Sequence, residues 1–146
     1  STWDAVDGAY SPSKKLIVVA EEKEVKTGIW APNNRTEDLV RHETGHAVNA
    51  AMDYISDDAD FLQSYEAEKK AIHPINQKPL AYFLQGGGIG ADETVAEAIA
   101  ASEGGATGGL LFEKSFTATI DLIKKRIQAF AAAPPSPAGA ASTPPP

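Results

Sequence analysis

The sequence predicts an α+β fold in which a small N-terminal sheet packs on a mainly helical remainder. Three observations indicate this: β-branched strand patterns are confined to residues 1–32, helical patterns dominate from Asn33 onward, and the C-terminal end lacks charged and large apolar side chains. Strands that come first and helices that follow are typical of α+β domains. The 146 residues are enough for one domain with one core.

Two segments near the N-terminus have the pattern of strands. Residues 15–22, KLIVVAEE, form a β-branched run after the turn-like YSPSKK, and residues 27–32, TGIWAP, form a weaker strand that ends at Pro32. No comparable strand pattern follows. We therefore expect one small sheet, such as a hairpin with a partner from residues 3–10, WDAVDGAY.

The first helix is expected from Asn33 to about Ile55. The segment NNRTED offers Asn and Thr as N-cap candidates, and Glu37 and Asp38 would complement the positive helix end. Several apolar side chains indicate a largely buried helix, and Gly45 suggests close approach of another backbone, since glycine in a helix otherwise costs about 1 kcal/mol. These apolar residues are Leu39, Val40, Ala47, Val48, Ala51 and Ile55.

Three further helical segments follow. The second helix covers residues 58–71, and the third covers residues 91–103 with Asp92 at its start. Residues 110–130 form one last helix, or two that are broken near Ser115.

The C-terminal residues 131–146, AAAPPSPAGAASTPPP, cannot bury enough apolar area to form a core, so we expect a flexible Pro/Ala-rich tail or linker after a domain of residues 1–130. The net charge of −7 argues against a nucleic-acid partner. The absence of cysteine excludes disulfides and thiolate metal sites. No run of about 18 apolar residues exists, so we expect no membrane span and a soluble protein. The start at Ser1, without a signal-like segment, fits a mature fragment or one domain of a longer protein.

The stretch LVRHETGHAVNA, residues 39–50, contains an HExxH motif. His42 and His46 are four residues apart, so both imidazoles lie on one helical face and could hold one zinc ion. Glu43 would lie beside the metal, where a general base takes a proton from water. The alternative is a histidine pair on an ordinary helix, because short motifs of this kind recur by chance.

A catalytic zinc site needs a third ligand. The extended motif HExxHxxGxxH is absent, because Asn49 and Met52 stand where it requires Gly and His. Asp53 and the loop residue His73 are weaker candidates.

The segment DETVAEAIAA, residues 92–101, is the better source of a third ligand. Glu93 and Glu97 share a helical face, and the alanines around them allow close helix packing. We expect Glu93 to bind the metal and Glu97 to hold a ligand histidine through its second ring nitrogen, although the two roles could be exchanged. The bland alternative is a solvated acidic stripe.

The combination of GAYSPSKKLIVVAEE, LVRHETGHAVNAAMDY and ADETVAEAIAA resembles the catalytic domain of the anthrax lethal factor family of zinc metallopeptidases, which includes the Pro-Pro endopeptidases. The resemblance covers about residues 5–130. It implies a compact zincin fold, zinc ligands His42, His46 and Glu93, the general base Glu43 and a supporting Glu97. Asn49 departs from the family motif, in which an acidic residue usually stands there.

The resemblance also implies a tyrosine that donates a hydrogen bond to the oxyanion of the tetrahedral intermediate. The candidate is Tyr82, which is farther from Glu93 in sequence than is usual in the family; Tyr65 and Tyr54 are alternatives, and Tyr82 could instead be a core aromatic. A peptide substrate would bind as an added strand at the edge formed by KLIVVA or TGIWA. The glycine-rich residues 86–90 would form a mobile rim or lid.

The leading functional hypothesis is a zinc-dependent endopeptidase that acts on a peptide or protein substrate. By resemblance alone, it would be a secreted or delivered, toxin-like bacterial protein. Two other hypotheses are a zincin-fold binding module without turnover and a metal-free helical interaction domain whose proline tail docks to SH3- or WW-like partners.

Overall fold

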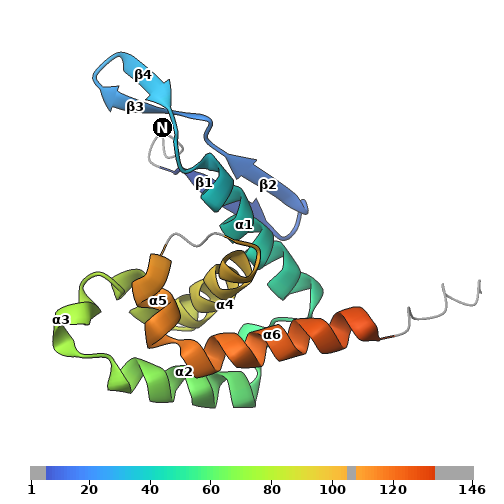
Figure 1. Cartoon of the computed structure of the whole chain (residues 1–146). Helices are drawn as coiled ribbons and strands as arrows, with labels where there is room; N and C mark the ends of the chain where they lie inside the picture. Colours follow the sequence, from blue (N-terminus) through green and yellow to red (C-terminus); the bar gives the residue numbers. More distant parts are fainter. Residues whose placement is uncertain (1–5, 105–107, 134–146) are drawn as a thin grey trace, which may run out of the picture.

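The computed structural model describes residues 6–104 and 108–133 and has the predicted α+β architecture (Figure 1). In these residues, four short strands come first and helices follow. The last helix, α6 (Thr117–Ala132), continues two residues past the predicted domain end at 130, and the predicted tail beyond it, residues 134–146, lies outside the described part. None of the described helices has both the length and the apolar character of a membrane span.

The expectation of one sheet is wrong, because the described strands form two separate antiparallel hairpins. Strand β1 (Gly8–Ser11) pairs with β2 (Leu16–Val19), and Gly8 lies opposite Val19. Strand β3 (Glu22–Lys26) pairs with β4 (Ile29–Pro32). The first hairpin packs on helix α1, whereas the second projects away from the helices (Figure 1).

The predicted strand at residues 15–22 corresponds to β2 and reaches only the first residue of β3. Strand β3, with the sequence EKEVK, is exposed along its whole length, so it lacks the buried alternation by which strands are recognised. A turn around Gly28, whose φ of +75° favours glycine, joins it to β4. The weaker strand predicted at residues 27–32 corresponds to β4.

Helix α1 (Thr36–Ala51) is shorter at both ends than predicted. Arg35 occupies the N-cap position instead of Asn or Thr, while the Asn33 side chain accepts a hydrogen bond from the Arg35 N–H at 3.2 Å. Two acidic side chains lie in the first turn, as expected. Beyond the helix, Asp53 and Tyr54 have φ of +58° and +61°, which right-handed helices exclude, and the 3-10 turn η1 (Ile55–Asp57) follows.

The buried residues of α1 are mainly polar ones: His42, Glu43 and Asn49, together with Gly45. Two of the apolar residues that were expected to be buried, Val40 and Ala51, are exposed. The HExxH face, not the apolar stripe, is turned toward the neighbouring helix, because that helix supplies polar partners for it.

The remaining helices follow the predicted order. Helix α2 (Ala59–Ala71) matches the second prediction. The predicted third helix is α4 (Ile89–Ser102), which starts after Gly88 at φ +85°, so Asp92 lies within its first turn and does not open it. The last segment forms two helices, α5 (Gly109–Ser115) and α6. This confirms the alternative in which residues 110–130 are broken near Ser115. The short elements α3 (Pro74–Gln77) and η2 (Ala81–Leu84) were not predicted.

The core lies around α4, which runs through the middle of the helical part (Figure 1). Helix α4 packs on α1 on one side and on α6 on the other, and nine of its residues are buried. Aromatic side chains from α2, α5 and the start of α6 belong to the same hydrophobic cluster as the buried side chains of α4. The most buried of these aromatic side chains are Phe61, Tyr65, Phe112 and Phe116.

Helices α1 and α4 pack closely against each other at Gly45. A Cβ atom at this position would lie 2.3 Å from the Ala96 carbonyl oxygen and 2.6 Å from its Cα. The backbone approach that the sequence suggested is therefore confirmed, and it brings the two helices together between His42 and His46.

Gly45→Ala is expected to lower the free energy of unfolding by about 1–3 kcal/mol, because the helices must separate to admit the methyl group. The gain in helix propensity, about 1 kcal/mol, offsets only part of this. Denaturant unfolding measures the change. Gly86→Ala is the matched control, since a Cβ atom there meets nothing within 4 Å. Equal stability of the two variants would contradict the close packing.

Candidate metal centre

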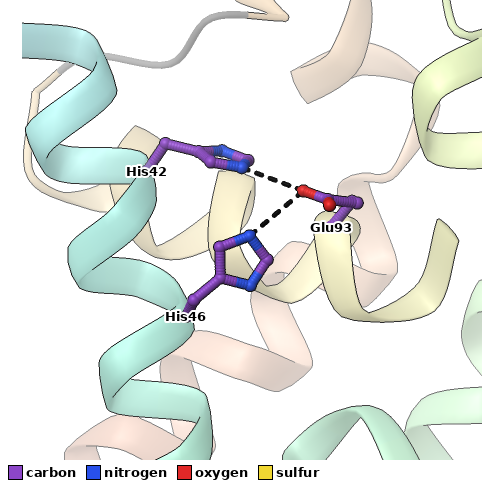
Figure 2. A group of neighbouring side chains, drawn as sticks. All are labelled: His42, His46 and Glu93. Atoms are coloured by element: carbon purple, nitrogen blue, oxygen red, sulfur yellow. Dashed lines mark hydrogen bonds and ion pairs between the residues drawn. The ribbon is translucent and has the colours of Figure 1, made fainter. Parts of the chain in front are cut away.

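Three side chains from two helices converge on one point (Figure 2). The Glu93 Oε2 atom lies 2.9 Å from His42 Nε2 and 3.1 Å from His46 Nε2. The donor atoms of all three side chains lie within 4.8 Å of one another. The two histidines come from α1 and the glutamate from the first half of α4, as the sequence predicted, so this group can hold a metal ion.

The other nitrogen of each imidazole also has a carboxylate partner. His42 Nδ1 donates to Glu97 Oε2 at 2.7 Å, and His46 Nδ1 lies 3.1 Å from Asp92 Oδ2. Glu97 is fully buried and also accepts a hydrogen bond from the Gly108 backbone N–H. With Nδ1 fixed in this way, each Nε2 is directed at the common point, which is how outer carboxylates orient histidine ligands.

Asp92 is a site residue that the sequence argument missed. Its Oδ1 atom accepts hydrogen bonds from Asn49 Nδ2 at 2.6 Å and from Ser56 Oγ at 3.2 Å, while Oδ2 faces His46. Asn49 is fully buried, whereas the Asp92 side chain is 39 % exposed, so this network runs from the interior to the surface. His46, like His42, needs a partner for its Nδ1 atom. This need could have pointed to Asp92, the acid next to Glu93 in the sequence.

The imidazoles carry positive charge in this arrangement. Burial acts to lower the pKa of His42, but hydrogen bonds to Glu93 and Glu97 outweigh it and raise the pKa to about 9. Burial is likewise outweighed at His46, where Asp92 and Glu93 raise the pKa to about 10. At Glu93, burial acts to raise the pKa, but the two imidazoles lower it to about 2. Without a metal, both N–H groups of each imidazolium ring face carboxylate oxygens of Glu93, Glu97 or Asp92.

These pKa values give the metal-free protein a defined pH dependence. The histidine pKa values lie above the ordinary 6.5, so the stability they contribute is fully present below about pH 6.5 and is lost as pH rises through about 9–10. We expect the unfolding midpoint in urea, measured with a chelator, to fall over this range. The double variant His42→Gln/His46→Gln should show a smaller fall, and a wild-type midpoint that stays level or rises would contradict the prediction.

Glu43 lies beside the cluster on the side of the β1–β2 hairpin. Its side chain is 7 % exposed, and a Cβ atom built on Gly8 would lie 3.1 Å from its Oε1. Burial raises the pKa of Glu43, against the lowering effects of His46, His42 and a hydrogen bond from the Tyr10 backbone. A raised pKa makes the Glu43 carboxylate a stronger base than an ordinary carboxylate.

Tyr82 also lies at the site. The turn through Gly87 and Gly88, both with positive φ, reverses the chain between η2 and α4 and so brings Tyr82 back to Glu93. Its hydroxyl hydrogen-bonds to Glu93, and its ring centre is 6.3 Å from that of His42. Burial is the largest cause that raises the pKa of Tyr82, so the hydroxyl keeps its proton. Tyr82 is half-exposed and therefore not a core residue.

The other candidates have different places. The Tyr65 hydroxyl is buried and donates to the Phe83 carbonyl at 2.6 Å, away from the cluster. His73 is exposed and accepts a hydrogen bond from the Ile75 N–H at the start of α3. Asp53 is exposed after the end of α1. Tyr54 lines the pocket beside the cluster.

The glycine-rich stretch at residues 86–90 is only partly the expected rim. Gly86, Gly87 and Gly88 are exposed, whereas Gly90 is buried in α4. A Cβ atom at Gly90 would lie 2.5 Å from the Phe83 carbonyl oxygen and 2.6 Å from the Tyr65 hydroxyl. Gly90 therefore serves close packing, which separates it from the rest of the stretch.

A pocket of about 300 Å³ opens between the cluster and β1. Its lining includes Glu43, His46, Glu93 and Tyr82, together with residues of β1. The strand that lines this pocket is therefore β1. The sequence had suggested KLIVVA or TGIWA for this position, and neither segment lines the pocket. Strand β1 pairs only with β2 among the described residues, so its second edge has no strand partner there.

The donor set fits a zinc ion. Two imidazole nitrogens and one carboxylate oxygen are typical ligands of catalytic zinc, and tetrahedral bonds of about 2.0–2.2 Å would place them ~3.4 Å apart, close to the separations from Glu93 seen here. The fold and this cluster define an α+β protein with a candidate two-histidine, one-glutamate metal centre. Comparisons with protein-family models, curated proteins and solved structures find no match to the chain.

Proposed function

We propose that the protein is a zinc-dependent endopeptidase. One observation carries this proposal: the cluster of His42, His46 and Glu93 borders a pocket whose lining includes a buried carboxylate, Glu43, and this carboxylate hydrogen-bonds to neither imidazole. A purely structural ion-pair network has no use for a fourth acid next to an open cavity. A hydrolytic site has one, because a base must take a proton from water.

His42, His46 and Glu93 would hold the metal, and Glu97 and Asp92 would fix the two imidazoles. Bound zinc with three protein ligands lowers the pKa of its water to about 7 and polarises a carbonyl group. With three protein ligands, a bound metal would keep a position open for water or substrate.

Glu43 is the general base in this proposal. It would accept a proton from the attacking water and return it to the amine that leaves, and its raised pKa makes it a stronger base than an ordinary carboxylate. The Tyr10 backbone N–H donates a hydrogen bond to its carboxylate, and the absence of a side chain at Gly8 leaves room for the carboxylate beside β1. Tyr82, protonated at neutral pH, donates a hydrogen bond where negative charge develops on the former carbonyl oxygen.

The substrate is a peptide or protein segment in extended conformation. The edge of β1 that pairs with no strand in the described part of the chain offers backbone hydrogen-bonding groups along the pocket, and an added strand would bring its own peptide bonds past the metal centre. Backbone pairing supplies affinity in this mode, and side-chain pockets supply selectivity.

The proposal includes membership in the lethal factor-like class of metallopeptidases. This membership is supported by two segments. HETGHAV in α1 contains His42 and His46, and ETVAEAIAA in α4 contains Glu93 and the outer carboxylate Glu97. On the same resemblance, we propose that the protein is secreted or delivered and acts outside the cell that produces it.

A peptide-library cleavage assay, read by mass spectrometry with and without a chelator, tests the proposal. We expect cleavage that the chelator stops and added zinc restores. Zinc binding without cleavage of any peptide would indicate a binding module instead. A protein that binds no zinc would overturn the metal centre and leave a helical interaction domain.

A further inference from the structure

A second cavity lies next to the metal centre, between the β1–β2 hairpin and the C-terminal half of α1. Its volume is about 470 Å³. Apart from Lys15, its lining is aromatic or apolar: Tyr10, Pro12, Ile17, Ala47, Ala50, Ala51 and Tyr54. No acidic side chain is among these residues, in contrast to the pocket at the cluster.

The two cavities adjoin and share part of their lining. Tyr10, Pro12, Ala50 and Tyr54 line both of them, so a chain that lies along β1 at the metal centre can place a side chain in the second cavity. Tyr54 is 39 % exposed, and its side chain has no hydrogen bond or ring contact with the other described residues. Its ring therefore forms a wall without an internal partner.

We propose that this cavity, the Tyr54 subsite, binds an aromatic or large aliphatic side chain of the peptide that is cleaved. The inference rests on the proposed endopeptidase function and adds a substrate class to it. The rings of Tyr10 and Tyr54 favour an aromatic side chain, since aromatic pairs gain stabilisation beyond the area they bury. Lys15, the charged residue of the lining, disfavours a cationic side chain.

The first test compares cleavage profiles of the zinc-loaded protein and of Ala51→Leu. Ala51 is exposed on the helix, so leucine there is compatible with folding while it fills the cavity. We expect the wild type to select Phe, Tyr, Leu or Met at one position near the cut. In Ala51→Leu, kcat/KM for such peptides should fall by at least about 10-fold, while peptides with Ala or Gly there change little. Ala67→Leu, at an exposed position of α2, is the matched control.

A second pair of variants separates recognition from folding. Glycine adopts the positive φ at residues 53 and 54 without strain, so Asp53→Gly and Tyr54→Gly both relieve the backbone. Only Tyr54→Gly removes the wall of the subsite. We expect both variants to retain the melting temperature and zinc binding, and only Tyr54→Gly to lose the side-chain preference.

The outcomes distinguish this inference from the proposed function. Cleavage without a side-chain preference, or a preference that Ala51→Leu and Tyr54→Gly leave unchanged, would overturn the Tyr54 subsite and leave the endopeptidase intact. A wild-type, zinc-loaded protein that cleaves no peptide overturns both.

Discussion

Glu43→Gln is expected to reduce peptide hydrolysis by about 10²–10⁴-fold, the usual contribution of a general base. Glutamine has nearly the same shape but cannot accept the proton of the attacking water. Since Glu43 makes no hydrogen bond to His42 or His46, zinc binding should remain. Cleavage of the best library peptide and zinc content by atomic absorption measure the two effects.

Two controls keep the interpretation of Glu43→Gln specific. Glu37→Gln, in the exposed first turn of the same helix, should leave hydrolysis unchanged. The unfolding midpoint of Glu43→Gln should be close to that of the wild type, because the two proteins differ only by one buried charge. Full hydrolysis by Glu43→Gln would show that another group is the base, and loss of zinc would show that Glu43 is a ligand.

Glu93→Ala is expected to weaken zinc binding more than any other single carboxylate substitution in the cluster. Its Oε2 atom is the point at which both Nε2 atoms meet, so its removal leaves two ligands instead of three. The loss should exceed the roughly 10–100-fold effect that outer hydrogen-bond partners have on metal affinity. Competition with a fluorescent zinc chelator measures the dissociation constant.

Glu97→Gln and Asp92→Asn are the comparison variants for Glu93→Ala. Each weakens the partner of one Nδ1 atom and keeps the shape of the side chain, so each should reduce zinc affinity within the roughly 10–100-fold range. If Glu97→Gln has the larger effect, the roles of Glu93 and Glu97 are exchanged. If Asp92→Asn has no effect, His46 is oriented without it.

Much of the candidate site could be predicted because helical periodicity converts sequence spacing into geometry. The four-residue spacing of His42 and His46 places both on one face, and the same spacing relates Glu93 to Glu97. The identity of Gly45 indicated close backbone approach, and the structure confirms it against Ala96. These are local consequences of residue type and spacing.

Other features could not be read from local pattern. Strand β3 was not predicted because both of its faces are exposed to solvent. Its residues therefore do not alternate between apolar and polar, which is the pattern by which a half-buried strand is recognised. Asp92 was expected to open α4, yet the helix starts at Ile89 and its carboxylate instead joins His46 to Asn49 and Ser56. A helix start that moves by one turn changes which face a polar residue occupies.

The sequence by itself determined the α+β order of elements and the residues that can meet at a metal ion, because both follow from periodicities of a few residues. Only the tertiary structure decided that Tyr82 returns to Glu93, that β1 lines the pocket and that Tyr54 closes a second cavity. Those contacts join residues far apart along the chain, and they depend on how helices and hairpins pack, which no short spacing specifies.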